Sequence, residues 1–165
     1  MIAVRQLNSA SFAPYGHVAC AGQGITKSIR ADTVLLTKTP SVFQHDAEAV
    51  DLALDFYDVQ PEGDVVRINQ AERHEHSSQM FVPMSVTRYL VIVWEGHPHE
   101  SAAHGFIGGP KDVVIYNPGV WHHGIIALDG PGHFASTMWR TRGGTDVEFL
   151  PLETALETRL QEAVS

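Results

Sequence analysis

The feature that most constrains this fold is a series of short β-forming runs separated by turns rich in proline and glycine. The runs are rich in β-branched and aromatic residues, which favour the half-buried surface of a sheet. They cover residues 65–68, 80–84, 89–94, 105–107, 112–116, 119–128 and 133–140, with weaker runs at 33–37 and 54–59. No helical pattern lies between them, so the chain is predicted to form an all-β sandwich or barrel.

Helical patterns occur only near the two ends of the chain. Residues 6–12 predict a capped turn of helix, with Asn8 or Ser9 as the N-cap. At the other end, Leu152, Leu156 and Leu160 recur every four residues and form one apolar stripe. We therefore expect a C-terminal helix over residues 152–164, packed outside the barrel.

The chain of 165 residues has the usual size of one domain, and we expect residues 1–165 to form a single one. No apolar run reaches the roughly 20 residues that a membrane helix needs, and the first residues lack the apolar stretch of a signal peptide. The lone cysteine, Cys20, cannot form an internal disulfide, which favours a cytoplasmic location. A net charge of −8 argues against nucleic acid and anionic membranes as partners. We expect a small-molecule substrate.

Histidine is unusually frequent, with 10 residues against 11 lysines and arginines together. A first segment runs from Glu72 to Gln79 and contains His74 and His76. Because side chains two apart on a strand share a face, Glu72, His74 and His76 can point into one pocket. Gln79 has the opposite parity unless residues 77–78 bend the chain. An imidazole and a carboxylate on one face are suitable ligands for a divalent transition metal.

A second segment, Asn-Pro-Gly-Val-Trp-His-His-Gly, covers residues 117–124. Its proline and glycine predict a turn that leads into a strand. Adjacent strand residues face opposite ways, so only one of His122 and His123 can point inward. Closing a sheet into a barrel brings inward residues of distant strands together. We therefore expect the two segments to line one pocket.

The two segments resemble the two motifs of the cupin superfamily. The second cupin motif is Pro-x-Gly-x-x-His, and it fits residues 117–122 with Asn117 in place of the proline. This resemblance implies that His122 is a metal ligand and that His123 points away.

The first cupin motif is His-x-His followed, after three or four residues, by Glu, and two registers are open for it. With His74 and His76 as the pair, only two residues precede Gln79. With Glu72 and His74 as the pair, four residues precede Gln79, and the spacing fits. The second register, which replaces one His by Glu72 and the Glu by Gln79, is preferred.

A narrower resemblance joins both segments. Glu72-Arg73-His74, Gln-x-Phe-x-Pro at 79–83 and Val-Trp-His-His at 120–123 are similar to the ureidoglycolate lyase family, as are residues 11–16 and Arg140. The resemblance implies a cupin double-stranded β-helix, a jelly-roll barrel, that splits ureidoglycolate into urea and glyoxylate in allantoin (purine) catabolism. One departure is that residues 21–41 lack the Asn-Asn-Gly segment, followed by an Arg and a His, that is usual in the family.

The same resemblance implies roles for individual residues. The metal ligands it implies are Glu72, His74, Gln79 and His122. The catalytic residues are His74, His122 and Tyr116, and the substrate-binding residues are Arg140 and His76. The metal implied is nickel, although these ligand types also admit zinc, manganese or iron. A homodimer is implied as well, because cupins commonly pair their sheets.

Two other functions are compatible with these motifs. Another metal-dependent cupin enzyme, such as a dioxygenase, an isomerase or a decarboxylase, would use the same barrel, because one fold hosts many chemistries. A non-catalytic, ligand-binding cupin is the second, since Glu in place of His and Gln in place of Glu weaken metal binding.

Overall fold

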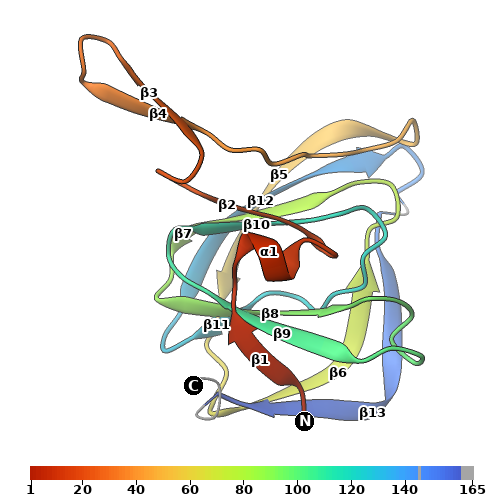
Figure 1. The fold of residues 1–165 in the computed structure, drawn as a ribbon. Coiled ribbons are helices and arrows are strands. Elements are labelled where there is room, and N and C mark those ends of the chain that lie inside the picture. Colours follow the sequence, from red (N-terminus) through yellow and green to blue (C-terminus); the bar gives the residue numbers. More distant parts are fainter. Residues whose placement is uncertain (145, 161–165) are drawn as a thin grey trace.

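The computed structural model describes residues 1–144 and 146–160 and is built almost entirely from strands (Figure 1). This confirms the all-β prediction. The strands are β1 (Ala3–Gln6), β2 (Gly16–Cys20), β3 (Ile25–Ile29), β4 (Val34–Lys38), β5 (Ala49–Val59), β6 (Val65–Arg73), β7 (Gln79–Ser85), β8 (Arg88–Trp94), β9 (Ala103–Gly108), β10 (Asp112–Tyr116), β11 (Ile126–Leu128), β12 (Gly132–Thr141) and β13 (Glu148–Arg159), and the one helix among the described residues is α1 (Ser9–Phe12).

Two sheets face each other to form the barrel. One has the order β1-β9-β8-β11 and the other the order β2-β10-β7-β12-β5, while β6 pairs with β13 and β3 with β4. The buried core between the two sheets includes Phe81 and Phe134 from the second sheet and Tyr89, Val91 and Val93 from the first. The barrel therefore closes around side chains that come from distant parts of the sequence.

Strand β8 lies between two hydrophobic clusters, which explains its continuous apolar sequence. Tyr89, Val91 and Val93 face the core between the sheets. The alternate residues Leu90, Ile92 and Trp94 face a second cluster, which β6 and β13 cover. Strand β8 is thus buried on both faces. The histidine-bearing segment after β10 hydrogen-bonds to it, from the amide of His123 to the carbonyl of Ile92.

The C-terminal segment corrects one prediction: the expected helix over residues 152–164 is wrong. Residues 148–159 form β13, which pairs antiparallel with β6 and changes register between Pro151 and Leu156. A spacing of four is also two strand repeats, so the stripe of Leu152, Leu156 and Leu160 fits either structure. In the fold these leucines pack against the second cluster, and pairing with β6 decides the conformation. Residues 161–164 of the expected helix lie outside the described residues.

The N-terminal turn is confirmed. Asn8 is the N-cap of α1, and its side chain accepts hydrogen bonds from the amides of Ala10 and Ser11. The turn buries Phe12, whose ring meets Phe106 edge-on at 5.3 Å between centroids. Among the described residues, no helix has the length and apolar character needed to cross a membrane.

The expected strand over residues 119–128 forms only in part. Regular pairing is confined to Ile126–Leu128, which pair with β8. Residues 117–125 instead run as an irregular segment along the barrel, fixed by isolated bridges from His122 to Glu72 and to Val93. These bridges place His122 at the end of β6.

Candidate metal centre

The structure brings three predicted ligands to one point inside the barrel. Glu72 lies near the end of β6, His74 directly follows this strand, and His122 lies on the segment after β10. The amide of Glu72 donates to the carbonyl of His122 over 2.7 Å, and the amide of His122 donates back over 2.8 Å. The amide of Gly119 donates to the carbonyl of His74 over 2.7 Å. Backbone pairing thus fixes the two motifs against each other.

Gln79 reaches the same point because the chain bends between β6 and β7. The bend lies at residues 75–76, slightly earlier than the predicted bend at 77–78, and β7 begins at Gln79. The new strand direction turns the Gln79 side chain inward, where it is 3% exposed. Its Oε1 lies 3.2 Å from Nε2 of His122.

The ligand atoms of Glu72, His74 and His122 all lie within 4.8 Å of one another. Nε2 of His122 is 3.5 Å from Oε1 of Glu72, and the rings of His74 and His122 are 5.4 Å apart between centroids. The side chains of His122 and Glu72 are 1% and 19% exposed. A carboxylate and two imidazoles that converge in a buried pocket form a donor set suited to a divalent transition metal.

Backbone carbonyls fix the tautomers of both histidines. Nδ1 of His74 lies 2.7 Å from the carbonyl of Asp146, and Nδ1 of His122 lies 2.9 Å from the carbonyl of Val120. Because a carbonyl only accepts, each Nδ1 carries the proton and each Nε2 presents a lone pair. Nε2 of His74 is buried and has no hydrogen-bond partner among the described residues. A buried lone pair aimed at a carboxylate fits a metal ion.

The local electrostatics favour the protonation states that a metal requires. Burial alone would raise the pKa of Glu72, but the hydrogen bond and charge of His122 and the charges of His74 and His123 lower it below its usual value. Burial, followed by the nearby charge of His122, lowers the pKa of His74. Near neutral pH the pocket therefore holds a carboxylate and a neutral imidazole.

Tyr116 lies beside this cluster, and burial changes its acidity. Its ring stacks on His122 at 4.1 Å between centroids, and its buried hydroxyl has no partner among the described residues. Burial, followed by the charges of Tyr89 and Glu72, raises the pKa of Tyr116 well above 10. The raised pKa keeps the hydroxyl of Tyr116 protonated near neutral pH and makes it a weaker acid than an unligated histidine.

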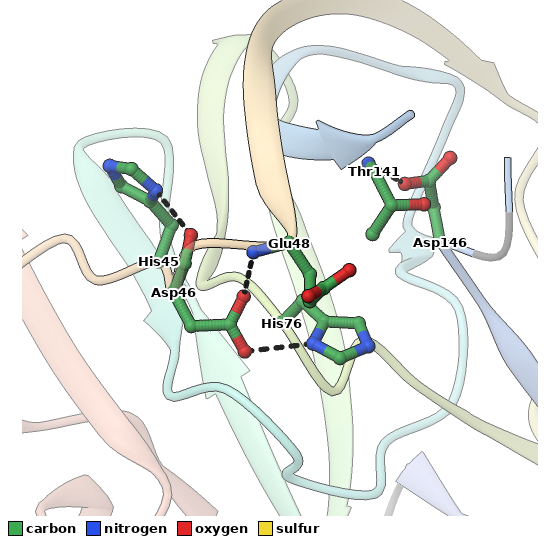
Figure 2. A network of polar contacts seen from close by, with 6 residues as sticks. All are labelled: His45, Asp46, Glu48, His76, Thr141 and Asp146. Carbon is green, nitrogen blue, oxygen red and sulfur yellow. Dashed lines mark hydrogen bonds and ion pairs between the residues drawn. The ribbon is translucent and has the colours of Figure 1, made fainter. Parts of the chain in front are cut away.

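Two other predicted residues lie outside the cluster. Nδ1 of His76 pairs with Oδ2 of Asp46 at 2.8 Å, as Figure 2 shows. The His76 side chain is 29% exposed and lines a separate 200 Å³ cavity with Arg73, Glu75, Asp146, Val147 and Glu148. Arg140 is exposed, and its Nη2 donates to both carboxylate oxygens of Asp55, over 2.9 and 2.7 Å.

The sequence patterns missed two residues near the site. Asp146 holds the tautomer of His74 through its carbonyl, and its carboxylate accepts a hydrogen bond from the amide of Thr141. Tyr57 is 37% exposed on β5; its ring meets Phe81 at 5.1 Å. Burial raises the pKa of Tyr57, as do Glu72 and Asp55, while Arg140 and Gln79 act against this. Neither residue belongs to a motif, so only the fold reveals them.

Comparison with known proteins gives a consistent result. The chain matches the family model described as Ureidoglycolate lyase over residues 1–159. A provisionally named ureidoglycolate lyase of Agrobacterium fabrum is 30% identical over 165 residues, which cover 98% of this chain and 96% of that protein. The ureidoglycolate lyase of Burkholderia cepacia is 29% identical, with 99% and 93% covered.

The solved structures include a crystal structure of a dTDP sugar isomerase from Desulfovibrio desulfuricans G20. It matches with a TM-score of 0.51 at 19% sequence identity, covering 86% of this chain and 88% of that one. At this level of identity the match shows the fold, which is the cupin jelly-roll barrel.

Proposed function

This chain belongs to the ureidoglycolate lyase family and is a lyase, and we propose that it splits ureidoglycolate into urea and glyoxylate. The observation that carries the proposal is the convergence of Glu72, His74 and His122 inside the barrel of a chain that matches this family over residues 1–159. The family match does not favour the two other functions considered from the sequence, another cupin enzyme or a ligand-binding cupin.

We assign Glu72, His74, Gln79 and His122 as the ligands of one divalent metal. The unpartnered Nε2 of His74 and the short distance from Nε2 of His122 to Oε1 of Gln79 support this assignment. Nickel remains our first choice because of the family resemblance, and nitrogen and oxygen donors also suit zinc, manganese and iron.

The reaction breaks a carbon–nitrogen bond. One carbon of ureidoglycolate bears a carboxylate, a hydroxyl and a ureido nitrogen. The hydroxyl loses its proton, its electrons form the aldehyde carbonyl of glyoxylate, and the nitrogen takes up a proton as urea leaves. A bound divalent metal supplies Lewis-acid stabilisation of the negative charge that develops at the hydroxyl oxygen.

The chain's own residues position the reacting groups. The carbonyls of Asp146 and Val120 hold the imidazoles of His74 and His122 in fixed orientations, which reduces rearrangement during the reaction. Tyr116 supports His122 by stacking. We propose that the proton for the leaving nitrogen comes from an unligated histidine or from Tyr116, whose buried hydroxyl has no hydrogen-bond partner among the described residues.

Substrate recognition falls to the rim of the pocket. We propose that Arg140 pairs with the carboxylate of the substrate, because a guanidinium matches a carboxylate in shape and charge. Among the described residues, the hydrogen bonds between Arg140 and Asp55 use Nη2 alone, which leaves the other nitrogens of Arg140 for a ligand. His76 is proposed to border the substrate without binding the metal.

The remaining proposals concern the setting of the enzyme. We propose that residues 1–165 form a single cupin domain, that the protein acts in the cytoplasm in allantoin catabolism, and that it is a homodimer. The single Cys20 supports the reducing compartment.

The decisive experiment is to incubate the metal-loaded protein with each enantiomer of ureidoglycolate and to measure urea and glyoxylate together. We expect equal amounts of both products from one enantiomer. Chelation followed by dialysis should abolish release, and adding back a divalent metal should restore it. Full activity after chelation would contradict the metal role. No urea from either enantiomer, with demonstrably metal-loaded protein, would indicate another cupin enzyme.

A further inference from the structure

The β3–β4 hairpin forms a two-stranded sheet of its own and belongs to neither sheet of the barrel. Within the part of the chain that the structure describes, its strands pair only with each other, and Figure 1 shows the hairpin extending away from the barrel. Ile25, Leu35 and Leu36 on it are 75%, 67% and 37% exposed. A lone two-stranded hairpin is marginally stable in water, so these apolar side chains need a surface to pack on.

The two faces of the hairpin differ. Paired residues share a face, and the register joins Ile25 to Lys38, Lys27 to Leu36 and Ile29 to Val34. One face therefore combines four aliphatic side chains with two lysines. The opposite face carries Leu35 among Thr26, Ser28 and Thr37. We call the face of residues 25, 27, 29, 34, 36 and 38 the basic apolar face.

A matching surface lies on β5, at the far edge of the five-stranded sheet from β2. Leu52, Leu54 and Phe56 alternate along this strand and are 61%, 64% and 67% exposed. They pair with Trp139, Thr137 and Ala135 of β12, so the apolar surface continues onto the next strand. The opposite face of this sheet already packs in the core, and a sheet with two apolar faces needs a second covering layer.

The charges of the two surfaces are complementary. Lys27 and Lys38 are two of the chain's three lysines, although the whole chain carries a net charge of −8. On β5, Asp58 follows Phe56 at the strand spacing of two, so its carboxylate shares the outer face, and its side chain is 79% exposed. The outer face of β5 carries no lysine or arginine, so the hairpin lysines and this carboxylate attract each other.

The hairpin does not cover β5 of its own chain, because Leu52, Leu54 and Phe56 remain exposed. Both complementary surfaces nevertheless lie on one chain. Two copies related by a two-fold axis can therefore each bind the hairpin of the other, which closes the assembly as a dimer. We propose that the basic apolar face of the hairpin packs on the outer face of β5 in a second copy of this chain. Each copy contributes its β3–β4 hairpin as an arm and binds the arm of the other copy. The inference rests on the homodimer proposed above.

Sedimentation velocity on the full-length, metal-loaded protein tests the arm with matched variants. Ile25→Glu on the hairpin and Phe56→Glu on β5 are each expected to raise the dimer dissociation constant by about 100-fold, because both residues lie at the proposed contact. Two controls are expected to change it by less than about threefold: Leu35→Glu, on the opposite face of the hairpin, and Val65→Glu, which is 47% exposed on β6. All four side chains are exposed, so the thermal midpoint should show that each variant still folds.

Mixing the Ile25→Glu and Phe56→Glu variants tests whether the hairpin of one copy contacts β5 of the other. The intact arm of the Phe56→Glu chain can bind the intact β5 face of the Ile25→Glu chain, so the mixture should form dimers that neither variant forms alone. Tight dimers of Ile25→Glu would overturn the arm and leave the homodimer standing. A wild-type protein that releases urea but sediments as a monomer would overturn both the arm and the homodimer, and would leave the lyase proposal intact.

Discussion

Two groups of histidines in this barrel differ in burial and in what holds them. His74 and His122 are 8% and 1% exposed, and each donates from Nδ1 to a backbone carbonyl. His76 and His133 have side chains 29% and 52% exposed, and pair with Asp46 and Asp58. A carbonyl partner does not titrate and fixes one tautomer, whereas an exposed ion pair is screened by water and contributes little. His123 also has a carbonyl partner but is only half-buried, so burial of the ring, rather than the residue type or the partner alone, distinguishes a site histidine.

The comparison can be tested cleanly because each histidine segment carries one buried and one more exposed histidine within two positions. His74 belongs to the buried cluster and His76 does not. His122 belongs to it, while the half-buried His123 donates from Nδ1 to the carbonyl of Gly124. Each motif thus contains its own control.

The largest effect is expected at His122. His122→Ala removes a proposed ligand that stabilises charge in the transition state, so kcat should fall by about 1,000-fold or more. His123→Ala should keep kcat within about tenfold of the wild type, since it removes no proposed ligand. Urea release measures both variants, and far-ultraviolet circular dichroism checks that they fold. Equal losses would erase the distinction between the two histidines.

His74 and His76 extend the same contrast to metal binding. His74→Ala should weaken metal affinity by about 100-fold or more, because it removes the unpartnered Nε2 from the pocket. His76→Ala should bind metal as the wild type does, because its ring is occupied by Asp46. Calorimetric titration of the chelated protein with nickel and zinc gives both affinities. Similar losses in the two variants would favour the literal His-x-His register of the motif.

Tyr89 tests how strongly the interior holds a proton. Burial, followed by the charge of Asp112, raises the pKa of Tyr89 far above its usual value of 10. The folded protein then keeps a proton that the unfolded chain loses near pH 10, so the free energy of unfolding falls as pH rises above that value. For each further pH unit, the contribution of Tyr89 lowers the free energy of unfolding by up to about 1.4 kcal/mol. Urea unfolding at pH 9 and pH 11 should show a smaller loss for Tyr89→Phe than for the wild type; equal losses would assign the effect to other groups.

The smallest effect is expected at the exposed rim. Arg140→Ala should raise the Michaelis constant by about tenfold with little change in kcat, because it removes a carboxylate contact that exists before and during the reaction. Arg88 is a matched control, since its side chain is 40% exposed against 48% for Arg140, and it also pairs with both oxygens of an aspartate, Asp129. Arg88→Ala should leave both constants unchanged. A fall in kcat with an unchanged Michaelis constant for Arg140→Ala would move Arg140 into the chemistry.

The sequence predicted most of the barrel because strand patterns are local. Runs of β-branched residues between proline–glycine turns require no distant partner to be recognised, and β7, β8 and β10 lie where these runs predict them. The prediction failed at β13, where spacing by four fits helix and strand alike and pairing with β6 decides. It also missed β2 and β3, whose sequences carry no strong β pattern.

For the candidate site, the sequence alone determined which residue types stand at which spacing. The parity of His122 and His123, and the distance from His74 to Gln79, follow from counting residues. Only the tertiary structure decided where these side chains point. The bend at residues 75–76 turns Gln79 inward, and the carbonyl of Asp146, 72 residues from His74 in sequence, selects its tautomer. The ion-pair partner of Arg140 is Asp55, which lies 85 residues away in sequence. Spacing is a property of the covalent chain, whereas orientation and burial arise from contacts between distant segments, which no local pattern encodes.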